Sequence, residues 1–229
     1  MDMITDLVSG LLVWAIPVLL AITLHEAAHG YAAYWLGDDT AKRAGRLSLN
    51  PLVHIDMVGT IIMPLVLLLL GGFMFGYAKP VPVRFGNLRN PRRDMMLVAA
   101  AGPATNLLLA LIGAVLLHLA VLMPEFLGSF LGRNLVNLVF FNCLLAVFNM
   151  LPLLPLDGGR VAHGLLPFRA AQRFARIEPY GIFIIVGVVF ILPRLGSAIG
   201  LNLDIARLII WRPVIGLTNW ILTTFGIAV

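Results

Sequence analysis

The sequence predicts an all-α polytopic membrane protein with five or six transmembrane helices, a re-entrant segment and a small β-hairpin at the membrane interface. Of the 229 residues, 60% are hydrophobic and only 12% are charged, whereas about 25% of the residues in a soluble domain are charged. Five stretches are apolar over the ~20 residues that a helix needs to cross a bilayer. The basic residues flank these stretches, as they do in proteins oriented in a membrane.

The five predicted spans lie, in chain order, at residues 6–36, 94–122, 133–155, 179–200 and 205–228. A sixth apolar stretch, 57–75, contains Gly59, Pro64, Gly71 and Gly72. Because glycine and proline weaken a regular helix, this stretch either crosses the bilayer or enters it and returns. Re-entrant backbone is tolerated in a membrane only where protein or a water-filled cavity covers it.

The distribution of basic residues favours the re-entrant alternative. If 57–75 returns to the side it came from, twelve Lys and Arg residues lie on one side of the membrane and three on the other. If it crosses, the split is six against nine. Since Lys and Arg collect on the cytoplasmic side, we expect the N-terminus outside and the C-terminus in the cytoplasm.

Two segments between the spans are expected to be structured. Residues 77–89 have short β-prone pieces broken by Pro and Gly, which indicates an extended hairpin. Residues 168–178 mix apolar and basic side chains, which suits a helix lying on the inner leaflet. No polar stretch is long enough for a soluble module, so we expect one domain over 1–229, with a catalytic core at about 6–165 and C-terminal helices at 179–228.

Charge and cysteine content exclude other classes of function. The net charge is +5 and the pI is near 10.0, but the basic residues belong to the membrane flanks, so we expect no nucleic-acid binding. The single cysteine, Cys143, excludes an internal disulfide and a zinc site made of thiolates. The N-terminus has no basic region or small-residue cleavage site, so the first span is expected to be retained as an anchor.

An HExxH motif lies inside the first apolar stretch, where His25 and Glu26 are followed by His29. On a helix, residues i and i+4 share a face, so the two imidazoles point the same way and can bind one zinc ion. Glu26 can then take a proton from a water molecule on that ion. A carboxylate at bilayer depth costs roughly 2.5–3.5 kcal/mol on insertion scales, which favours a functional site over a polar cluster that joins helices.

The third ligand of the predicted zinc site is Asp157. A catalytic zinc usually has three protein ligands and an open fourth position. Only two acidic residues, Glu26 and Asp157, stand directly against long apolar runs at plausible site positions. Pro152 and Pro155 prevent a regular helix before Asp157, and the two glycines after it permit a sharp turn. An unwound segment of this kind lets the carboxylate reach inward; the alternative is an ordinary turn residue.

The order of the spans supports this pairing. With 57–75 re-entrant, one crossing separates the first span from the span that leads to Asp157, so those two spans run parallel. The HExxH motif lies past the midpoint of its span and Asp157 lies at the end of its own, so both are expected toward the cytoplasmic side.

At these residues the chain resembles the site-2 proteases, a family of intramembrane zinc metalloproteases. The family pattern Asn-x-x-Pro-x-x-x-Leu-Asp-Gly matches from Asn149 to Gly158, and the family mark Gly-Pro-x-x-Asn matches from Gly102 to Asn106. The resemblance covers about residues 15–165. The chain looks like the short bacterial type, because it lacks a PDZ domain, a CBS domain and a span before the HExxH helix.

The resemblance implies an activity and a location. It implies one Zn²⁺ per chain, held by His25, His29 and Asp157, with Glu26 activating water. The implied partners are transmembrane protein or peptide substrates and the lipid bilayer. The implied location is the bacterial cell (inner) membrane, multi-pass, with the active site toward the cytoplasm.

Four further residues are candidates for contact with the substrate. Asn149 is assigned a catalytic role, as a donor to the substrate backbone or the oxyanion. A substrate helix must unwind before cleavage, and we expect it to add as a strand beside 71–83, which makes Gly71 and Gly72 candidate substrate-binding residues. Asn106 is a candidate of the same kind, with a helix–helix hydrogen bond as its alternative.

Two other functions would use the same residues. A membrane metal transporter or metal-binding protein would be expected to carry several polar sites and often inverted repeats, and neither is visible here. A catalytically dead relative that only binds helices would have no need of Glu26. The sequence does not determine the substrate or the oligomeric state.

Overall fold

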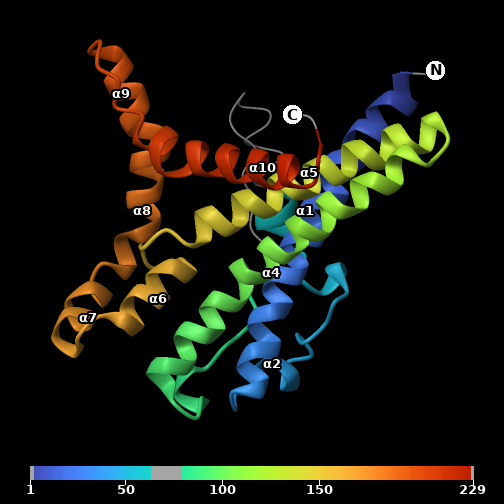
Figure 1. Cartoon of the computed structure of the whole chain (residues 1–229). Helices are drawn as coiled ribbons and strands as arrows, with labels where there is room; N and C mark the ends of the chain where they lie inside the picture. Colours follow the sequence, from blue (N-terminus) through green and yellow to red (C-terminus); the bar gives the residue numbers. More distant parts are fainter. Residues whose placement is uncertain (1–2, 63–78, 228–229) are drawn as a thin grey trace.

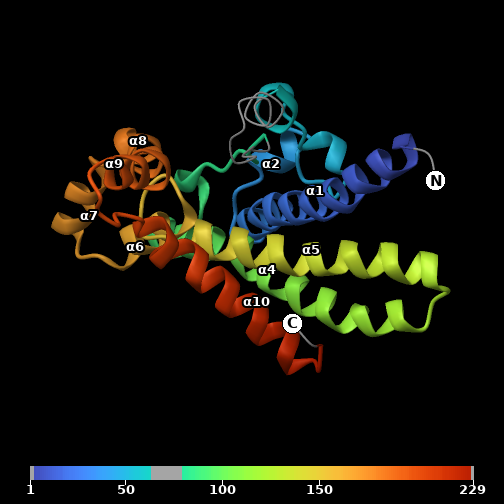
Figure 2. The ribbon, with the colours of Figure 1, turned by 90° about the horizontal axis from the view of Figure 1, so that it is seen from above.

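The centre of the molecule is a bundle of three long helices. The computed structural model describes residues 3–62 and 79–227, which are mostly helical, and the bundle consists of α1 (Met3–Trp35), α4 (Pro91–Val121) and α5 (Glu125–Asn149). Each of the three helices packs against the other two. Figures 1 and 2 show α1 and α5 running in the same direction and α4 in the opposite one, which is the arrangement predicted for the HExxH span and the span before Asp157.

Small residues allow α4 and α5 to approach closely. Ala110 and Ala114 on α4 and Val139 and Cys143 on α5 are all fully buried in one apolar cluster. A Cβ added at Gly113 would lie 3.2 Å from a methyl carbon of Val139, tighter than an ordinary contact. Membrane helices associate largely through van der Waals packing of this kind, because the surrounding lipid is as apolar as their side chains.

The described chain between α1 and α4 contains only short helices. These are α2 (Thr40–Arg43), η1 (Pro51–Val53), the π-helical η2 (Met57–Ile62) and η3 (Phe85–Asn87). Of the predicted re-entrant stretch, only η2 is described, and residues 63–75 lie outside the described residues. Residues 79–84 have no regular structure, no strand is found in 3–62 or 79–227, and residues 77–78 of the predicted hairpin are not described. The hairpin and the path of 57–75 therefore stay predictions.

The predicted third span ends earlier than its apolar sequence does. Helix α5 stops at Asn149, and residues 150–156, which include Pro152 and Pro155, form an irregular link. Proline lacks the backbone N–H of a helix interior, which explains the break. Helix α6 (Asp157–Leu165) begins directly at the predicted ligand and packs against α4.

The remaining helices lie beside this core (Figure 1). They are α7 (Phe168–Ala175), η4 (Glu178–Tyr180), α8 (Gly181–Val186), η5 (Gly187–Ile191), α9 (Leu192–Ala198), η6 (Arg207–Trp211) and α10 (Arg212–Thr224). Helix α10 packs on α5 and α4, where Val214 and Ile221 join the core cluster.

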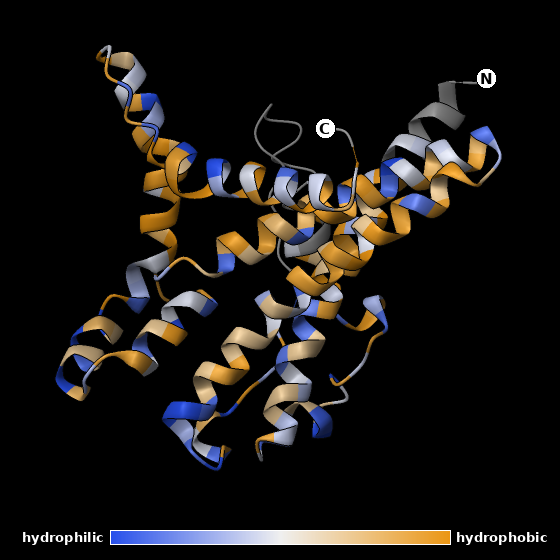
Figure 3. Ribbon diagram, in the orientation of Figure 1, coloured by the Kyte–Doolittle hydropathy of each residue, from blue (hydrophilic) through white to orange (hydrophobic). Residues whose placement is uncertain are grey.

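Four helical stretches of the described residues are long and apolar enough to cross a membrane. They are Leu12–Trp35, Pro91–Val121, Glu125–Asn149 and Phe168–Ala198. The predicted span at 205–228 is helical over η6 and α10 but is not among the four. The predicted helix at 168–178 is found as α7 over Phe168–Ala175, and the fourth stretch includes it; its position on the inner leaflet stays a prediction. Figure 3 shows the hydrophobic colour along the helices and the hydrophilic colour at the start of α4 and in α7.

Candidate active site

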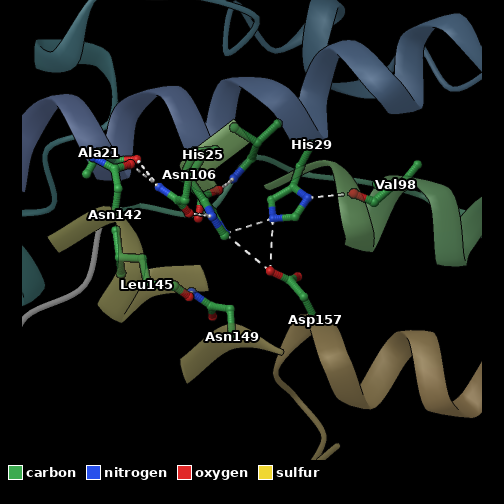
Figure 4. Close-up of polar contacts among 11 residues, drawn as sticks. Ala21, His25, His29, Val98, Asn106, Asn142, Leu145, Asn149 and Asp157 are labelled. Atoms are coloured by element: carbon green, nitrogen blue, oxygen red, sulfur yellow. Dashed lines mark hydrogen bonds and ion pairs between the residues drawn. The ribbon is translucent and has the colours of Figure 1, made fainter. Parts of the chain in front are cut away.

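The two histidines of the HExxH motif project from one face of α1. Their imidazole centroids are 4.6 Å apart and the ring planes are nearly perpendicular, at 88°. The side chains of His25 and His29 are only 8% and 12% exposed. Their Nε2 atoms lie 3.0 Å apart and face the start of α6 (Figure 4).

Asp157 brings a carboxylate to the same point from the other end of the sequence. Its Oδ2 lies 3.2 Å from His25 Nε2 and 3.3 Å from His29 Nε2. The predicted role of the two following glycines was wrong: Gly158 and Gly159 make no sharp turn but occupy the first turn of α6. A Cβ at Gly158 would lie 2.2 Å from the Met150 carbonyl oxygen. Both glycines are therefore needed because the 150–156 link packs directly against the helix that carries Asp157.

Hydrogen bonds on the far side of each ring determine which nitrogen faces the site. His29 Nδ1 lies 2.7 Å from the backbone carbonyl of Val98. A carbonyl only accepts, so Nδ1 carries the proton and the Nε2 of a neutral His29 has a lone pair. His25 Nδ1 lies 2.6 Å from the side-chain oxygen of Asn106, which produces the same tautomer.

With both imidazoles neutral, three electron-pair donors therefore converge on one another. The two Nε2 atoms and the carboxylate oxygen of Asp157 all carry lone pairs, and that Asp157 oxygen has no hydrogen-bond donor in the part of the chain that is described. Mutual repulsion at 3.0–3.3 Å is relieved by a cation. Zinc bonds of about 2.0–2.1 Å in tetrahedral geometry place ligand atoms roughly 3.3 Å apart, so the triangle of donors fits this ion.

Among the described residues, His25, His29 and Asp157 form the one group of His, Cys, Asp or Glu side chains whose ligand atoms converge, all within 4.8 Å of one another. Glu26 is not part of that group. As the residue three positions before His29, it flanks the same helix face. One of its carboxylate oxygens, Oε2, accepts a hydrogen bond of 2.8 Å from the backbone N–H of Val81. Glu26 therefore stands next to the metal-binding group without joining it.

The 79–84 segment that contacts Glu26 is held at both ends. At one end, Lys79 donates its N–H to the His54 carbonyl at 2.9 Å and its own carbonyl accepts from Arg46 at 2.6 Å. At the other end, the N–H of Arg84 donates to the Asp38 carboxylate at 2.6 Å. These contacts place the N–H of Val81 at Glu26.

This arrangement bears on the predicted substrate edge at 71–83. Residues 79–83 are its described part. The N–H groups of Lys79 and Val81 are used within the protein, and Pro80 and Pro82 have none. The described part of the edge therefore offers few donors to an added strand. Gly71 and Gly72 lie outside the described residues.

Asn106, a predicted substrate-binding residue, lies behind His25 within the helix bundle. Its side chain is completely buried and bonds to His25 and to the backbone carbonyl of Ala21 on α1, at 2.6 and 3.2 Å. The alternative prediction, a hydrogen bond between helices, describes its position. Asn149 lies at the end of α5 on the same side as Asp157 (Figure 4), and its amide donates to the Leu145 carbonyl at 3.0 Å.

Sequence reasoning missed several residues that shape the site. Gly102 was noted only as part of a motif, yet a Cβ there would lie 2.5 Å from His29 Nε2 and 2.6 Å from His25 Cε1. Val81 carries its contact through the backbone, which no side-chain pattern reveals. Asn142 on α5 bonds to Asn106, and its polar character inside an apolar span was an available signal.

Comparison with known proteins agrees with this geometry. The sequence model of "Peptidase family M50" matches residues 13–129, which contain the HExxH motif and end before Asp157. A Bacillus subtilis (strain 168) protein named "Putative zinc metalloprotease YwhC" is 43% identical over 80% of this chain and 81% of that protein. Proteins named "Putative zinc metalloprotease Rip2" from Mycolicibacterium smegmatis and Mycobacterium tuberculosis (strain H37Rv) are 30% and 28% identical, over 77% and 78% of this chain and 66% of each relative. No solved structure matches.

The relatives' names and the family match support a protease that depends on zinc. The four membrane-length helices are those expected of a multi-pass membrane protein. The family match over 13–129 and the 43% identity show that this chain belongs to peptidase family M50, the site-2 protease family.

Proposed function

We propose that the protein is an intramembrane zinc endopeptidase that cleaves transmembrane segments of membrane-protein substrates. The observation that carries this proposal is the convergence of His25, His29 and Asp157, two of them on a helix of membrane-spanning length and hydropathy. Polar groups at such depth are costly to keep, and the ligand atoms of these three residues are directed at one another.

The three converging residues would hold one zinc ion per chain and leave a fourth position open. When bound, zinc supplies Lewis-acid chemistry to a peptide carbonyl and makes water more acidic. The Nδ1–H bonds from His25 to Asn106 and from His29 to Val98 keep both rings in the orientation that this role needs.

Glu26 is the proposed general base. Its carboxylate is held through one oxygen by the Val81 N–H, so the other oxygen can receive the proton of the attacking water. The same carboxylate then returns a proton to the leaving amine. Asn149 is proposed to donate a hydrogen bond to the substrate backbone or oxyanion. To do so, its amide must release the Leu145 carbonyl to which it donates in this structure.

The proposed location is the bacterial inner membrane with the site toward the cytoplasm. The start of α4, with Arg92 and Arg93, and α7, with Arg169 and Arg173, carry many of the basic residues. Basic residues favour the cytoplasmic face.

The test is cleavage by the detergent-purified chain of a panel of single-span membrane peptides, with and without a zinc chelator. Glu26→Gln is expected to keep bound zinc and to lose cleavage by about 10²–10⁴-fold, because only the base is removed. His25→Ala is expected to lose both zinc and cleavage.

His118→Ala provides the matched control, because His118 is exposed on α4 and its hydrogen bond among the described residues goes to the Val115 carbonyl. It should keep zinc and activity. Wild-type cleavage by Glu26→Gln would contradict the proposed base. Zinc flux across vesicles, with no peptide ever cut, would favour a transporter instead.

A further inference from the structure

We propose that Asn142 is a positioning residue for the metal site. Acting through Asn106, it holds His25 in the tautomer that presents Nε2 to the metal. The inference rests on the proposed zinc site, and it assigns a role to a residue outside the HExxH, Gly-Pro-x-x-Asn and Leu-Asp-Gly patterns.

The first step is burial. Asn142 and Asn106 are both 0% exposed, in the centre of the α1–α4–α5 bundle (Figure 4). A buried amide that lacks a partner costs about 1–3 kcal/mol, so the amides must be fully satisfied by one another and by nearby backbone. Their orientation is therefore determined by the partners available.

The second step is the orientation of Asn142. Its Nδ2 donates to the Leu138 carbonyl, one turn earlier on α5, at 2.8 Å. Because that carbonyl accepts only, the amide cannot be reversed without placing two oxygens together. The Oδ1 of Asn142 is consequently directed at Asn106, whose Nδ2 lies 2.8 Å away.

The third step is the orientation of Asn106. Its NH₂ group is held by two acceptors, Asn142 Oδ1 and the Ala21 carbonyl at 3.2 Å. Its oxygen is thereby turned to His25, at 2.6 Å from Nδ1. His25 must then carry its proton on Nδ1, which leaves the Nε2 lone pair facing His29 and Asp157.

These hydrogen bonds form a relay from the Leu138 carbonyl on α5, through Asn142 and Asn106, to His25 on α1. In each of them a donor faces an acceptor. A reversed Asn106 would point its NH₂ at His25 and favour a proton on Nε2, where it blocks metal binding. Groups that hold a ligand histidine typically change metal affinity 10–100-fold when removed. Asn142 is one hydrogen bond further from His25, so its removal is expected to reduce zinc affinity less than removal of Asn106.

The competing explanation is that Asn142 only joins helices. A second asparagine on α5 provides the comparison: Asn137 donates to the Val13 carbonyl on α1 at 2.9 Å, so it also tethers α5 to α1, but it touches no site residue in any contact described. A purely structural role predicts that the two asparagines behave alike.

The experiment measures two quantities on the full chain in detergent. The first is the zinc dissociation constant, by competition with a chromophoric chelator. The second is the ¹⁵N chemical shift of the histidine rings in metal-free protein, which reports the tautomer. The variants are Asn142→Leu, Asn142→Asp, Asn106→Leu and Asn137→Leu, with Asn142→Ala measured in place of Asn142→Leu if the latter does not fold.

Asn142→Leu is expected to weaken zinc binding by up to about tenfold, and Asn106→Leu by about 10–100-fold. Both should shift the His25 ring toward the Nε2–H tautomer. Asn142→Asp is expected to be neutral at this buried site, so that its O–H donates to the Leu138 carbonyl and its other oxygen stays opposite Asn106. It should therefore keep both quantities near the wild-type values, and Asn137→Leu should change neither.

The inference is overturned if the folded Asn142→Leu protein has the wild-type tautomer and zinc affinity, or if Asn137→Leu shows an equal loss. Absence of zinc binding by the wild type would refute the proposed function. The His25 tautomer of metal-free protein would still test the relay, so the two failures are distinguishable.

Discussion

At the residue scale, the metal-binding group depends on a position that has no side chain. Gly102 lies in α4 directly against both imidazoles, and a Cβ there would come within 2.5 Å of His29 Nε2 and 2.6 Å of His25 Cε1. Real Cβ atoms do not approach so closely, and the rings cannot retreat without breaking the bonds to Asn106 and Val98. The absence of one methyl group therefore determines whether the donors can converge.

Gly102→Ala is expected to reduce cleavage by about 100-fold, since misplacement of reacting groups by about 1 Å costs that much, and to weaken zinc binding. Both are measured on purified protein. Gly216→Ala is the control, because Gly216 lies in α10 with nothing within 4 Å of an added Cβ. Equal activity of the two variants would show that the rings have room to move.

At the element scale, an irregular segment presents its backbone to the proposed base. Residues 79–84 are tied to His54 at one end and to Asp38 at the other. Pro80 and Pro82 restrict the residues before them to extended conformations, so the Val81 N–H is held out toward Glu26. The segment acts as part of the active site although no side chain of it bonds to a site residue in the contacts described.

Val81→Pro removes the N–H that holds Glu26. A hydrogen bond to a charged group contributes about 1.5–3 kcal/mol, so kcat is expected to fall at least about tenfold while bound zinc stays constant. Val81→Ala keeps the N–H and should retain most of kcat. If the alanine variant falls as far as the proline variant, the Val81 side chain and not its N–H is what matters.

The contribution of Asp38, which anchors this segment, to the stability of the fold is expected to decrease in acid. Burial tends to raise the pKa of Asp38, but hydrogen bonds from Thr40, the Arg84 N–H and Asn87 together hold it below its ordinary value. A carboxyl whose native pKa is depressed stabilises the fold above the pKa that it has in the unfolded chain, about 3.9. That stabilisation is lost as the pH falls through the lower native pKa.

Asp38→Asn is therefore expected to lower the free energy of unfolding by about 1–3 kcal/mol at neutral pH, because hydrogen bonds to a buried charge are lost. The difference from wild type should begin to shrink below about pH 4 and vanish once the pH is below the lowered native pKa of Asp38. Unfolding in detergent from pH 7 to 3 measures both. Asp39→Asn is the control, since Asp39 makes an exposed pair with Arg43 and exposed ion pairs contribute little to stability. A difference that persists in acid would contradict the assignment.

At the scale of the whole molecule, the metal-binding group brings together residues from the first helix and from a helix more than 120 residues later in the chain. His25 and His29 come from α1, Asp157 begins α6, and α4 supports the rings between them. A metal ion that binds only the folded chain stabilises it by mass action. Metal occupancy and global stability are therefore linked.

Removal of zinc is expected to lower the unfolding temperature, and zinc at about 100 times its Kd is expected to restore about 2.7 kcal/mol. Glu26→Gln should show the same stabilisation, because Glu26 lies outside the converging group. Asp157→Asn should show much less. Calorimetry in detergent with and without zinc measures the effect, and an equal response of Asp157→Asn would mean that the metal binds elsewhere.

The sequence alone determined most of the helical architecture and the chemistry of the site. Long apolar stretches predict membrane helices because a bilayer demands satisfied backbone and apolar side chains, and α1, α4 and α5 follow. Local spacing placed His25 and His29 on one face, and the prolines before Asp157 predicted the break in the helix. Two predicted membrane segments did not follow from the apolar pattern alone: 205–228 is helical but not among the candidate spans, and residues 63–75 lie outside the described residues.

Only the tertiary structure decided how these residues are held. The roles of Gly102, Asn142 and the Val81 N–H depend on which segments touch and at what distance. The same is true of the hydrogen bond by which Asn106 joins α4 to α1. Because a helix repeats about every 3.6 residues, the spacing of two residues in the sequence is enough to predict whether they share a face. Contacts between residues far apart in the chain are set by packing of whole helices, which no short pattern encodes.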